Sequence, residues 1–322
     1  MGRNMITGGL GLVGRQLAQL LVDKGEEVVV MDVAPATIMA SHLRDRVEVV
    51  RKDITNWSQT MDAVKSSGID TIYHTAAILP PGTEQNPAVA YSVNLTGTHN
   101  ILEAARLLDV EKVVFSSSCA VWNSEVPNPI PNEQAQFPVT MYGATKVACE
   151  RLGEFYWKRY NLDFRSVRLI CIMGPGRVAG VGWTAYTSLV IEETAKGNPF
   201  TLSVKEDLLL HFIYLKDVAY SLYDIKNADR TRLTRCVYNV DGFSATTGQI
   251  VSAIMKHNPS ARIDYKFDPD YQHVMDTEYV NLAKRSDDSL ARRDWGWTPH
   301  YNLDTAIADF INDVKTGAVL TA

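Results

Sequence analysis

The segment Thr7-Gly8-Gly9-Leu10-Gly11-Leu12-Val13-Gly14 is the starting point for predicting the fold of this 322-residue chain. An apolar pattern typical of a strand precedes it at 4–7, and a periodic pattern typical of a helix follows at 12–24. Glycines allow a tight turn and close approach of the backbone to a pyrophosphate, and amides at a helix N-terminus favour an anion. A plain glycine turn is the alternative interpretation, but the flanking strand and helix favour a dinucleotide-binding loop. The residues expected to bind the cofactor here are Gly8, Gly11, Leu12, Val13 and Gly14.

An acidic residue stands where such a loop predicts one. Asp32 ends the next apolar run and lies 18 residues beyond Gly14. A carboxylate at this place accepts hydrogen bonds from the adenosine ribose and repels a 2′-phosphate. The following Val33-Ala34-Pro35 offers no arginine or lysine to bind that phosphate. The sequence therefore predicts NAD rather than NADP.

Strand and helix patterns alternate through the first half of the chain. Buried-strand patterns occur at 27–32, 47–52, 71–75, 112–116 and 164–172. Helical patterns occur at 57–66, 88–108 and 141–160, and a proline-rich stretch at 123–138 is expected to be a surface loop. Short connections between such units imply an α/β fold with a doubly wound parallel sheet.

The alternation becomes less regular after a glycine- and proline-rich loop at 173–183. Helices are expected at 185–196, 216–225, 247–256 and 303–315. We expect an NAD-binding Rossmann domain at 1–173, completed by parts of 210–240, and a smaller substrate-binding lobe over most of 174–322. Trp295 and Trp297 are expected in the core of that lobe, and the charged run 285–293 on a solvated helix face.

Composition and charge exclude several classes of protein. The chain has 32 basic and 37 acidic residues, a net charge of −5, which disfavours a nucleic-acid partner. No apolar run approaches the length of a membrane span and the N-terminus shows no signal-peptide pattern, so we expect a cytoplasmic protein that does not bind membranes. The four cysteines have no C-x-x-C spacing and the seven histidines no metal-binding pattern. We therefore expect buried, reduced thiols and no metal.

A second motif, Tyr142-Gly143-Ala144-Thr145-Lys146, carries a candidate acid/base pair. Four-residue spacing places Tyr142 and Lys146 on one face of a helix. A nearby ammonium and the positive ring of an oxidised nicotinamide both favour phenolate, so we expect a lowered pKa for Tyr142. A phenol of that kind is a general acid/base for interconverting a hydroxyl and a carbonyl. Two surface residues on an amphipathic helix are the alternative.

With these motifs in place, the chain resembles a known family, the extended short-chain dehydrogenases/reductases of the NAD-dependent epimerase/dehydratase group. The resemblance covers nearly the whole chain. Besides 7–14, Asp32 and 142–146, the matching stretches are 52–54, 73–77, 94–98, 116–121, 174–176, 212–219 and 295–299.

The resemblance implies roles for individual residues. Asp53 and Ile54 would border the adenine, and Ala76 and Ala77 would approach the cofactor ribose. Asn94 also belongs to a matching cofactor-binding stretch. Lys146 would hold the nicotinamide ribose. In the pattern Ser116-Ser117-Ser118-Cys119-Ala120-Val121, the serine three before the valine is the catalytic one. Ser118 would therefore orient the reacting oxygen, together with Tyr142 and Lys146.

Departures from the family pattern narrow the reaction. Dehydratases of the group carry Asp-Glu after the catalytic residue, whereas Cys119-Ala120 follow Ser118, which argues against dehydration. Sugar-nucleotide epimerases carry an asparagine where Cys171 stands and Arg-Asp where Leu210-His211 stand. The loss of that arginine removes charge-assisted hydrogen bonds to a diphosphate. Alternative anion contacts are Arg177, His211 and Arg285, and surface solvation is the competing interpretation for each.

The substrate pocket is less well defined by the sequence. Cys171, Arg177 and Trp183, with Ser118, are candidates for substrate contacts. Trp122 and Met173 are candidates for pocket walls, with ordinary core packing as the alternative.

We therefore expect an NAD-dependent oxidoreductase acting on a small polyol, hydroxy acid or sugar derivative. An epimerase that retains its NAD uses the same residues and stays open as an alternative. A non-catalytic NAD sensor is disfavoured by the intact Ser118, Tyr142 and Lys146. Helices 88–108 and 141–160 carry apolar residues beyond one stripe. The resemblance implies that these helices pair with their copies, so we expect a homodimer, with a monomer as the alternative.

Overall fold

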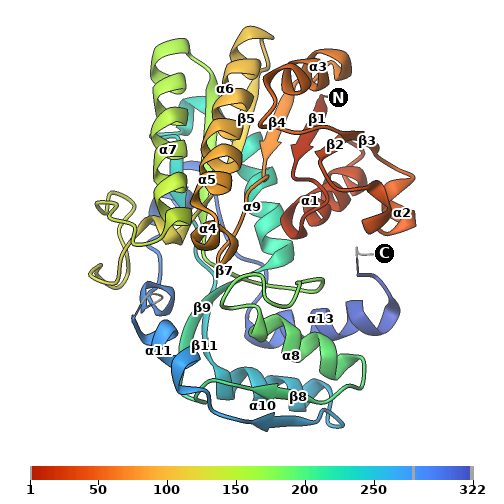
Figure 1. Ribbon diagram of the computed structural model, residues 1–322, viewed down its shortest axis with the longest axis vertical. Coiled ribbons are helices and arrows are strands. Elements are labelled where there is room, and N and C mark those ends of the chain that lie inside the picture. Colours follow the sequence, from red (N-terminus) through yellow and green to blue (C-terminus); the bar gives the residue numbers. More distant parts are fainter. Residues whose placement is uncertain (1, 278–279, 320–322) are drawn as a thin grey trace.

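The structure is a computed structural model, and it describes residues 2–277 and 280–319. Its central feature is a seven-stranded parallel sheet in the order β10-β6-β5-β4-β1-β2-β3 (Figure 1). The strands are β1 (Arg3–Thr7), β2 (Glu27–Asp32), β3 (Glu48–Arg51), β4 (Thr71–His74), β5 (Lys112–Ser118), β6 (Asp163–Leu169) and β10 (Val237–Asn239). The predicted doubly wound Rossmann sheet is thereby confirmed.

Helices cover both faces of this sheet. They are α1 (Leu12–Asp23), α2 (Ser41–Arg44), α3 (Trp57–Ser67), α4 (Gly82–Gln85), α5 (Pro87–Ala90), α6 (Gly97–Leu107), α7 (Met141–Tyr160) and α9 (Leu215–Asn227). Successive side chains of a strand point to opposite faces. Ile6 therefore packs with α1 and α9 in one apolar cluster, while its neighbour Met5 packs with α3, α6 and α7 in another.

The second half of the chain builds a lobe below the sheet in Figure 1. Its strands form a three-stranded sheet, β11-β9-β7, and a pair, β12-β8. The strand bounds are β7 (Cys171–Met173), β8 (Phe200–Leu202), β9 (Leu209–Tyr214), β11 (Phe243–Thr246) and β12 (Ile263–Tyr265). The helices of the lobe are α8 (Tyr186–Ala195), α10 (Thr247–His257), α11 (Pro269–Thr277) and α13 (Leu303–Thr316), whereas α12 (Ser289–Trp295) lies beside β10 of the main sheet. A third apolar cluster joins α8, α10, α13 and β9.

The chain crosses between these two parts more than once. The strand predicted at 164–172 is split: Leu169 still pairs with Ser118 in the main sheet, but Cys171 pairs with Phe212 of the second sheet. The split occurs because β5 ends at Ser118 and leaves nothing for the following residues to pair with. In the other direction, β10 and α9 return from the second half to the first-half sheet. The domain boundary at residue 173 stays a prediction.

The helix predicted at 88–108 forms as one helical run over 87–107, in which a π-helical stretch, η2 (Tyr91–Thr96), lies between α5 and α6. One further expectation is wrong. Trp295 and Trp297 lie in the cluster of the Rossmann sheet and not in the lobe core, because α12 packs beside β10 and Trp295 contacts Tyr238.

The loop at 123–138 is only partly a surface loop. Val126 and Ile130 are buried in the cluster that contains α1 and α9. Ile130 also pairs with Ser286 through the backbone. This loop is therefore attached both to the sheet domain and to the chain segment that precedes α12.

Among the described residues, no helix is both long and apolar enough to cross a membrane.

Candidate active site

A cavity of about 510 Å³ opens where the strands of the main sheet end. Residues at the carboxyl ends of β1, β2, β4, β5 and β6 line it, which is where α/β sheets bind ligands. The second lobe contributes β7, the loop before α8 and the short helix η5 (Val280–Ala283). The cavity therefore lies between the two parts of the molecule.

The glycine loop is shaped as cofactor binding requires. Gly8 has a φ of +66°, and a Cβ there would lie 2.5 Å from the Cα of Ala76. A Cβ on Gly14 would lie 2.5 Å from the carbonyl oxygen of Gly8. No side chain caps α1, and Leu12 and Val13, whose amides find no partner inside the helix, line the cavity. This backbone cradle fits a pyrophosphate.

Asp32 is held at the end of β2 by two backbone amides. Its carboxylate accepts from the Leu10 amide and from the Ala34 amide, each at 3.0 Å, and the residue lines the cavity. Arg15, a nearby cation, is buried and donates to the Leu10 carbonyl, and it does not line the cavity. The Asp32 carboxylate therefore lies at the cavity and forms no ion pair with a described basic residue, so it can accept from a ribose hydroxyl.

The other expected cofactor residues divide into two groups. Asp53, Ile54, Ala76 and Ala77 all line the cavity. Asn94 does not: it is 2% exposed, accepts from the Ile78 amide at 2.8 Å and donates to the Ile78 carbonyl at 3.1 Å. Its place is behind the wall, where it fixes the segment that follows β4.

Ser118, Tyr142 and Lys146 meet at the junction of β5 and α7, and all three line the cavity. The Lys146 ammonium donates to the Ser116 carbonyl at 2.6 Å and lies 5.6 Å from the centre of the Tyr142 ring. The Ser118 hydroxyl accepts from the Ala120 amide at 3.1 Å.

The local sequence explains this approach of helix to strand. The Thr140 hydroxyl caps α7 by accepting from the Gly143 amide at 3.0 Å. A Cβ on Gly143 would lie 2.1 Å from the Ala120 carbonyl oxygen. Only glycine at this position lets the first turn of α7 pack against the segment that follows Ser118.

Burial controls the titration of the pair. Burial lowers the pKa of Lys146 to about 8, although Cys149 and Glu150 oppose the shift. Burial raises the pKa of Tyr142 well above its ordinary value, and a hydrogen bond with Ser118 opposes this only partly. The predicted lowering of the Tyr142 pKa is therefore wrong for the chain by itself, because desolvation outweighs the neighbouring groups.

The candidate substrate residues also divide. Cys171, Arg177, Trp183 and Trp122 line the cavity, whereas Met173 is fully buried in the lobe core. No pattern in the sequence pointed to the lining residues Thr184, Asn281 and Leu282, because only the folded lobe brings them to the site.

Arg177 is the cation on the lobe side of the cavity. It donates to the Ile172 carbonyl at 2.8 Å and forms no ion pair with any carboxylate in the described ranges. Burial lowers its pKa from the ordinary value. A partly buried guanidinium of this kind suits a carboxylate ligand.

The other two anion-contact candidates are occupied elsewhere. His211 and Arg285 both contact the buried Asp241 carboxylate, and neither lines the cavity. Leu210 is buried in the lobe core. Leu210 and His211 stand where nucleotide-sugar epimerases carry arginine and aspartate, and neither of them lines the cavity.

The described residues contain no cluster of three or more histidine, cysteine, aspartate or glutamate side chains that could hold a metal ion. All four cysteines are buried and free.

Comparisons with known proteins agree with this geometry. Residues 4–240 match the NAD-dependent epimerase/dehydratase family. The chain belongs to this family. The mitochondrial L-threonine 3-dehydrogenase of Bos taurus is 30% identical over 312 residues, 96% of this chain and 82% of the bovine one.

Two solved structures are similar along their whole length. The GalE-like L-threonine dehydrogenase from Cupriavidus necator, in its holo form, has a TM-score of 0.87 at 29% identity and covers 97% of this chain and 100% of its own. A monomeric L-threonine 3-dehydrogenase from a metagenome has a TM-score of 0.87 at 25% identity, with 98% and 100% covered.

The family and these relatives confirm the expected class. The chain is an NAD-dependent enzyme of the extended short-chain dehydrogenase/reductase type, which interconverts a hydroxyl and a carbonyl on a small substrate.

Proposed function

We propose that this enzyme is a dehydrogenase of small β-hydroxy carboxylic acids, and that L-threonine is its first candidate substrate. The observation that carries the proposal is Arg177, a cavity-lining guanidinium without a carboxylate partner among the described residues. Full-length similarity to enzymes named L-threonine 3-dehydrogenase supports it.

The cofactor fits residues of the sheet domain. Gly8, Gly11, Leu12, Val13 and Gly14 would hold the pyrophosphate of NAD. Asp32 would accept from the adenosine ribose, and Asp53, Ile54, Ala76 and Ala77 would border the rest. When bound, NAD accepts a hydride from the substrate carbon that bears the hydroxyl.

The chain's own residues manage the proton. Ser118 would orient the substrate oxygen, and Tyr142 would take the hydroxyl proton as the carbonyl forms. Lys146 would supply the positive charge that favours the phenolate. The oxidation is balanced, because the carbon loses a hydride and the oxygen loses a proton.

The direct test replaces Arg177 and varies the substrate. Arg177→Gln should raise KM for L-threonine at least ~10-fold, because a charge-assisted contact to the carboxylate is lost. The analogue 2-amino-1,3-butanediol, which keeps the ammonium but lacks the carboxylate, should show no such loss in Arg177→Gln. Arg262→Gln, at an exposed site just before β12, is the control. If Arg177→Gln leaves the KM for L-threonine unchanged, the proposed carboxylate contact is refuted.

Retention of NAD during purification distinguishes a dehydrogenase from an epimerase. A dehydrogenase should exchange NAD during gel filtration, whereas an epimerase should keep it. Purified protein that holds NAD through dilution and forms no NADH with any hydroxy acid would favour the epimerase.

We further propose a homodimer in the cytoplasm, in which residues 1–173 with β10 and α9 form the NAD-binding domain. Exposed apolar side chains on the outer face of α5, η2, α6 and α7 support the dimer: Val89, Tyr91, Leu107, Phe155 and Tyr160. A related enzyme is described as monomeric, so the state has to be measured.

A further inference from the structure

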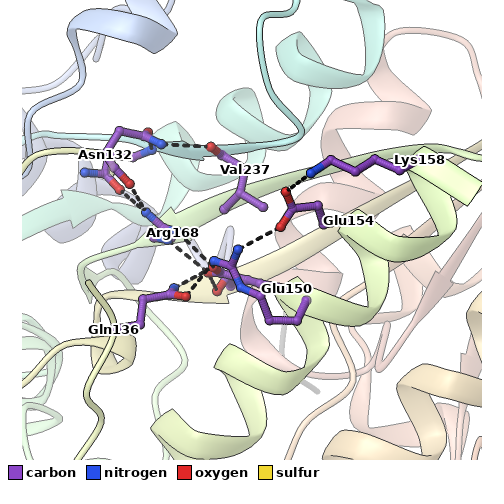
Figure 2. A network of polar contacts seen from close by, with 10 residues as sticks. Asn132, Gln136, Glu150, Glu154, Lys158, Arg168 and Val237 are labelled. Carbon is purple, nitrogen blue, oxygen red and sulfur yellow. Dashed lines mark hydrogen bonds and ion pairs between the residues drawn. The ribbon is translucent and has the colours of Figure 1, made fainter. Parts of the chain in front are cut away.

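A buried ion pair lies directly behind the catalytic residues. Glu150 of α7 is 0% exposed and Arg168 of β6 is 3% exposed. The guanidinium binds the carboxylate at two points, Nε to Oε1 at 3.0 Å and Nη2 to Oε2 at 2.9 Å (Figure 2). Neither residue lines the cavity. A buried ion pair is rarely a net source of stability, so we looked for a role of this pair in the active site.

The carboxylate side of the pair reaches the catalytic strand end. The Ser117 hydroxyl donates to Glu150 Oε1 at 2.5 Å, and Ser117 is flanked by Ser116 and Ser118. Glu150 also lies one helical turn after Lys146. One carboxylate therefore ties together the strand that carries Ser118 and the helix that carries Lys146.

The guanidinium side reaches the wall of the cavity. Arg168 lies over the Trp122 ring, 5.3 Å from its centre, and Trp122 lines the cavity. Arg168 also donates to the Asn132 carbonyl at 2.8 Å and to Asn239 Oδ1 at 3.1 Å. The pair therefore holds the loop that follows Trp122 against β10.

The network extends to the molecular surface. The Gln136 amide donates to Glu150 Oε2 at 2.6 Å and accepts from Arg151, which pairs in turn with Glu154 (Figure 2). The Asn132 amide donates to the Val237 carbonyl at 3.1 Å. The 123–138 loop is thus attached to the pair at two points, Asn132 and Gln136.

We propose that Glu150 and Arg168 are positioning residues for this reaction: they hold Ser118, Lys146 and Trp122 in one fixed arrangement. This inference rests on the catalytic roles given above. The loop, the strand end and the helix come from separate parts of the chain, and no other ion pair among the described residues joins all three.

The charge of Glu150 has an electrostatic consequence at Lys146. Glu150 and Cys149 raise the pKa of Lys146 against the effect of burial. The other groups facing the ammonium are Tyr142, the Phe115 ring and the buried, neutral His74. Without the Glu150 charge, Lys146 should lose its proton at a lower pH.

The test compares two buried carboxylates, each of which pairs with an arginine of β6. Glu150→Gln keeps the shape and removes the charge. Asp163→Asn is the matched control, because Asp163 pairs with the buried Arg165 at the opposite end of β6 with contacts of 2.7 and 2.8 Å. Both variants leave a buried arginine without its carboxylate and should lose stability.

Only Glu150→Gln should disturb the site. We expect its kcat to fall ~10- to 100-fold, as misplacement of catalytic groups does, with KM for NAD within about threefold. The alkaline limb of its kcat profile should move to lower pH. Amide hydrogen exchange should become faster in peptides covering 116–122 and 130–136. Asp163→Asn should keep the wild-type kcat, pH profile and exchange in these peptides.

A milder variant provides a second test in case Glu150→Gln does not fold. Ser117→Ala removes only the hydroxyl that joins the strand end to Glu150 and keeps the ion pair. It should lower kcat severalfold and speed exchange in 116–122. A wild-type kcat and unchanged exchange in either variant would overturn the inference.

The exchange measurement also separates this inference from the proposed substrate class. If the wild-type enzyme oxidises no hydroxy acid, the proposed function fails. Faster exchange in 116–122 and 130–136 of Glu150→Gln, and not of Asp163→Asn, would still support the positioning role, and equal exchange would refute it.

Discussion

The Lys146 ammonium donates to the main-chain carbonyl of Ser116 at 2.6 Å. This contact joins α7 to the end of β5 two residues before Ser118. Since the same ammonium lies 4.4 Å from the centre of the Phe115 ring, its position is fixed from two sides. The lysine is therefore oriented by the chain itself, before any ligand contributes.

Replacement of the Tyr142 hydroxyl tests the acid/base assignment. Tyr142→Phe should lower turnover at least ~100-fold, because a general acid/base contributes about that much or more. Its NAD affinity, measured by calorimetry, and its melting temperature should stay near wild type. Tyr160→Phe, at an exposed tyrosine on the same helix, is the control. Turnover close to wild type in Tyr142→Phe would remove this residue from the mechanism.

Cofactor choice tests the role of Asp32. Its carboxylate should repel a 2′-phosphate, so the dissociation constant for NADP should exceed that for NAD. Asp32→Ala should narrow the difference by relieving the repulsion. Equal constants in the wild-type enzyme, or tighter binding of NADP, would contradict the assignment. Asp45→Ala, at an exposed carboxylate, should leave the ratio unchanged.

The buried His74 predicts a specific loss of stability in acid. Burial, assisted by Lys146, lowers its pKa from 6.5 to about 3. Its ring is held between Thr7 and Thr98 at 2.6 and 2.9 Å. Between these pH values the unfolded chain binds a proton that the native chain does not, so stability falls as the pH drops below 6.5.

The difference between the two pKa values of His74 sets the expected loss of unfolding free energy. From pH 6.5 to pH 5, His74 should account for about 1.5 kcal/mol of the lost unfolding free energy. His74→Gln should lose this part of the pH dependence in urea titrations, and His42→Gln, at an exposed histidine, should keep it. Identical pH dependence in all three proteins would show that His74 titrates normally.

Light scattering tests the proposed dimer. The chain mass is 35.8 kDa, and we expect twice that at micromolar concentration. Phe155→Lys should dissociate the dimer without unfolding the subunit, because Phe155 is 50% exposed on α7. Phe137→Lys, at an exposed apolar residue of the 123–138 loop, should not. A mass near 35.8 kDa for the wild-type protein would refute the dimer.

Local patterns were sufficient for the sheet and for the cofactor end of the site. Gly8, Gly14 and Asp32 are close in sequence to the strands that position them, and the spacing of Tyr142 and Lys146 is fixed by one helix. Predictions failed where distant segments decide the outcome. Trp295 packs on the Rossmann sheet because the chain returns to β10, a contact that no local pattern encodes.

The lobe side of the site shows the same limit. Asn281 and Leu282 enter the cavity from a short helix far along the chain, and His211 turns away from it to meet Asp241. The pKa of Tyr142 could not be read from its neighbours in sequence either, because the degree of burial decides its direction.

Transfer of a labelled hydride would show whether this enzyme oxidises L-threonine at C3. L-Threonine carrying deuterium at C3 is incubated with the enzyme and NAD, and the NADH formed is analysed by mass spectrometry. We expect NADH one mass unit heavier, together with oxidation of C3 to a carbonyl, and a rate that falls at least ~100-fold in Tyr142→Phe. No NADH from L-threonine, or NADH without the label, would contradict it.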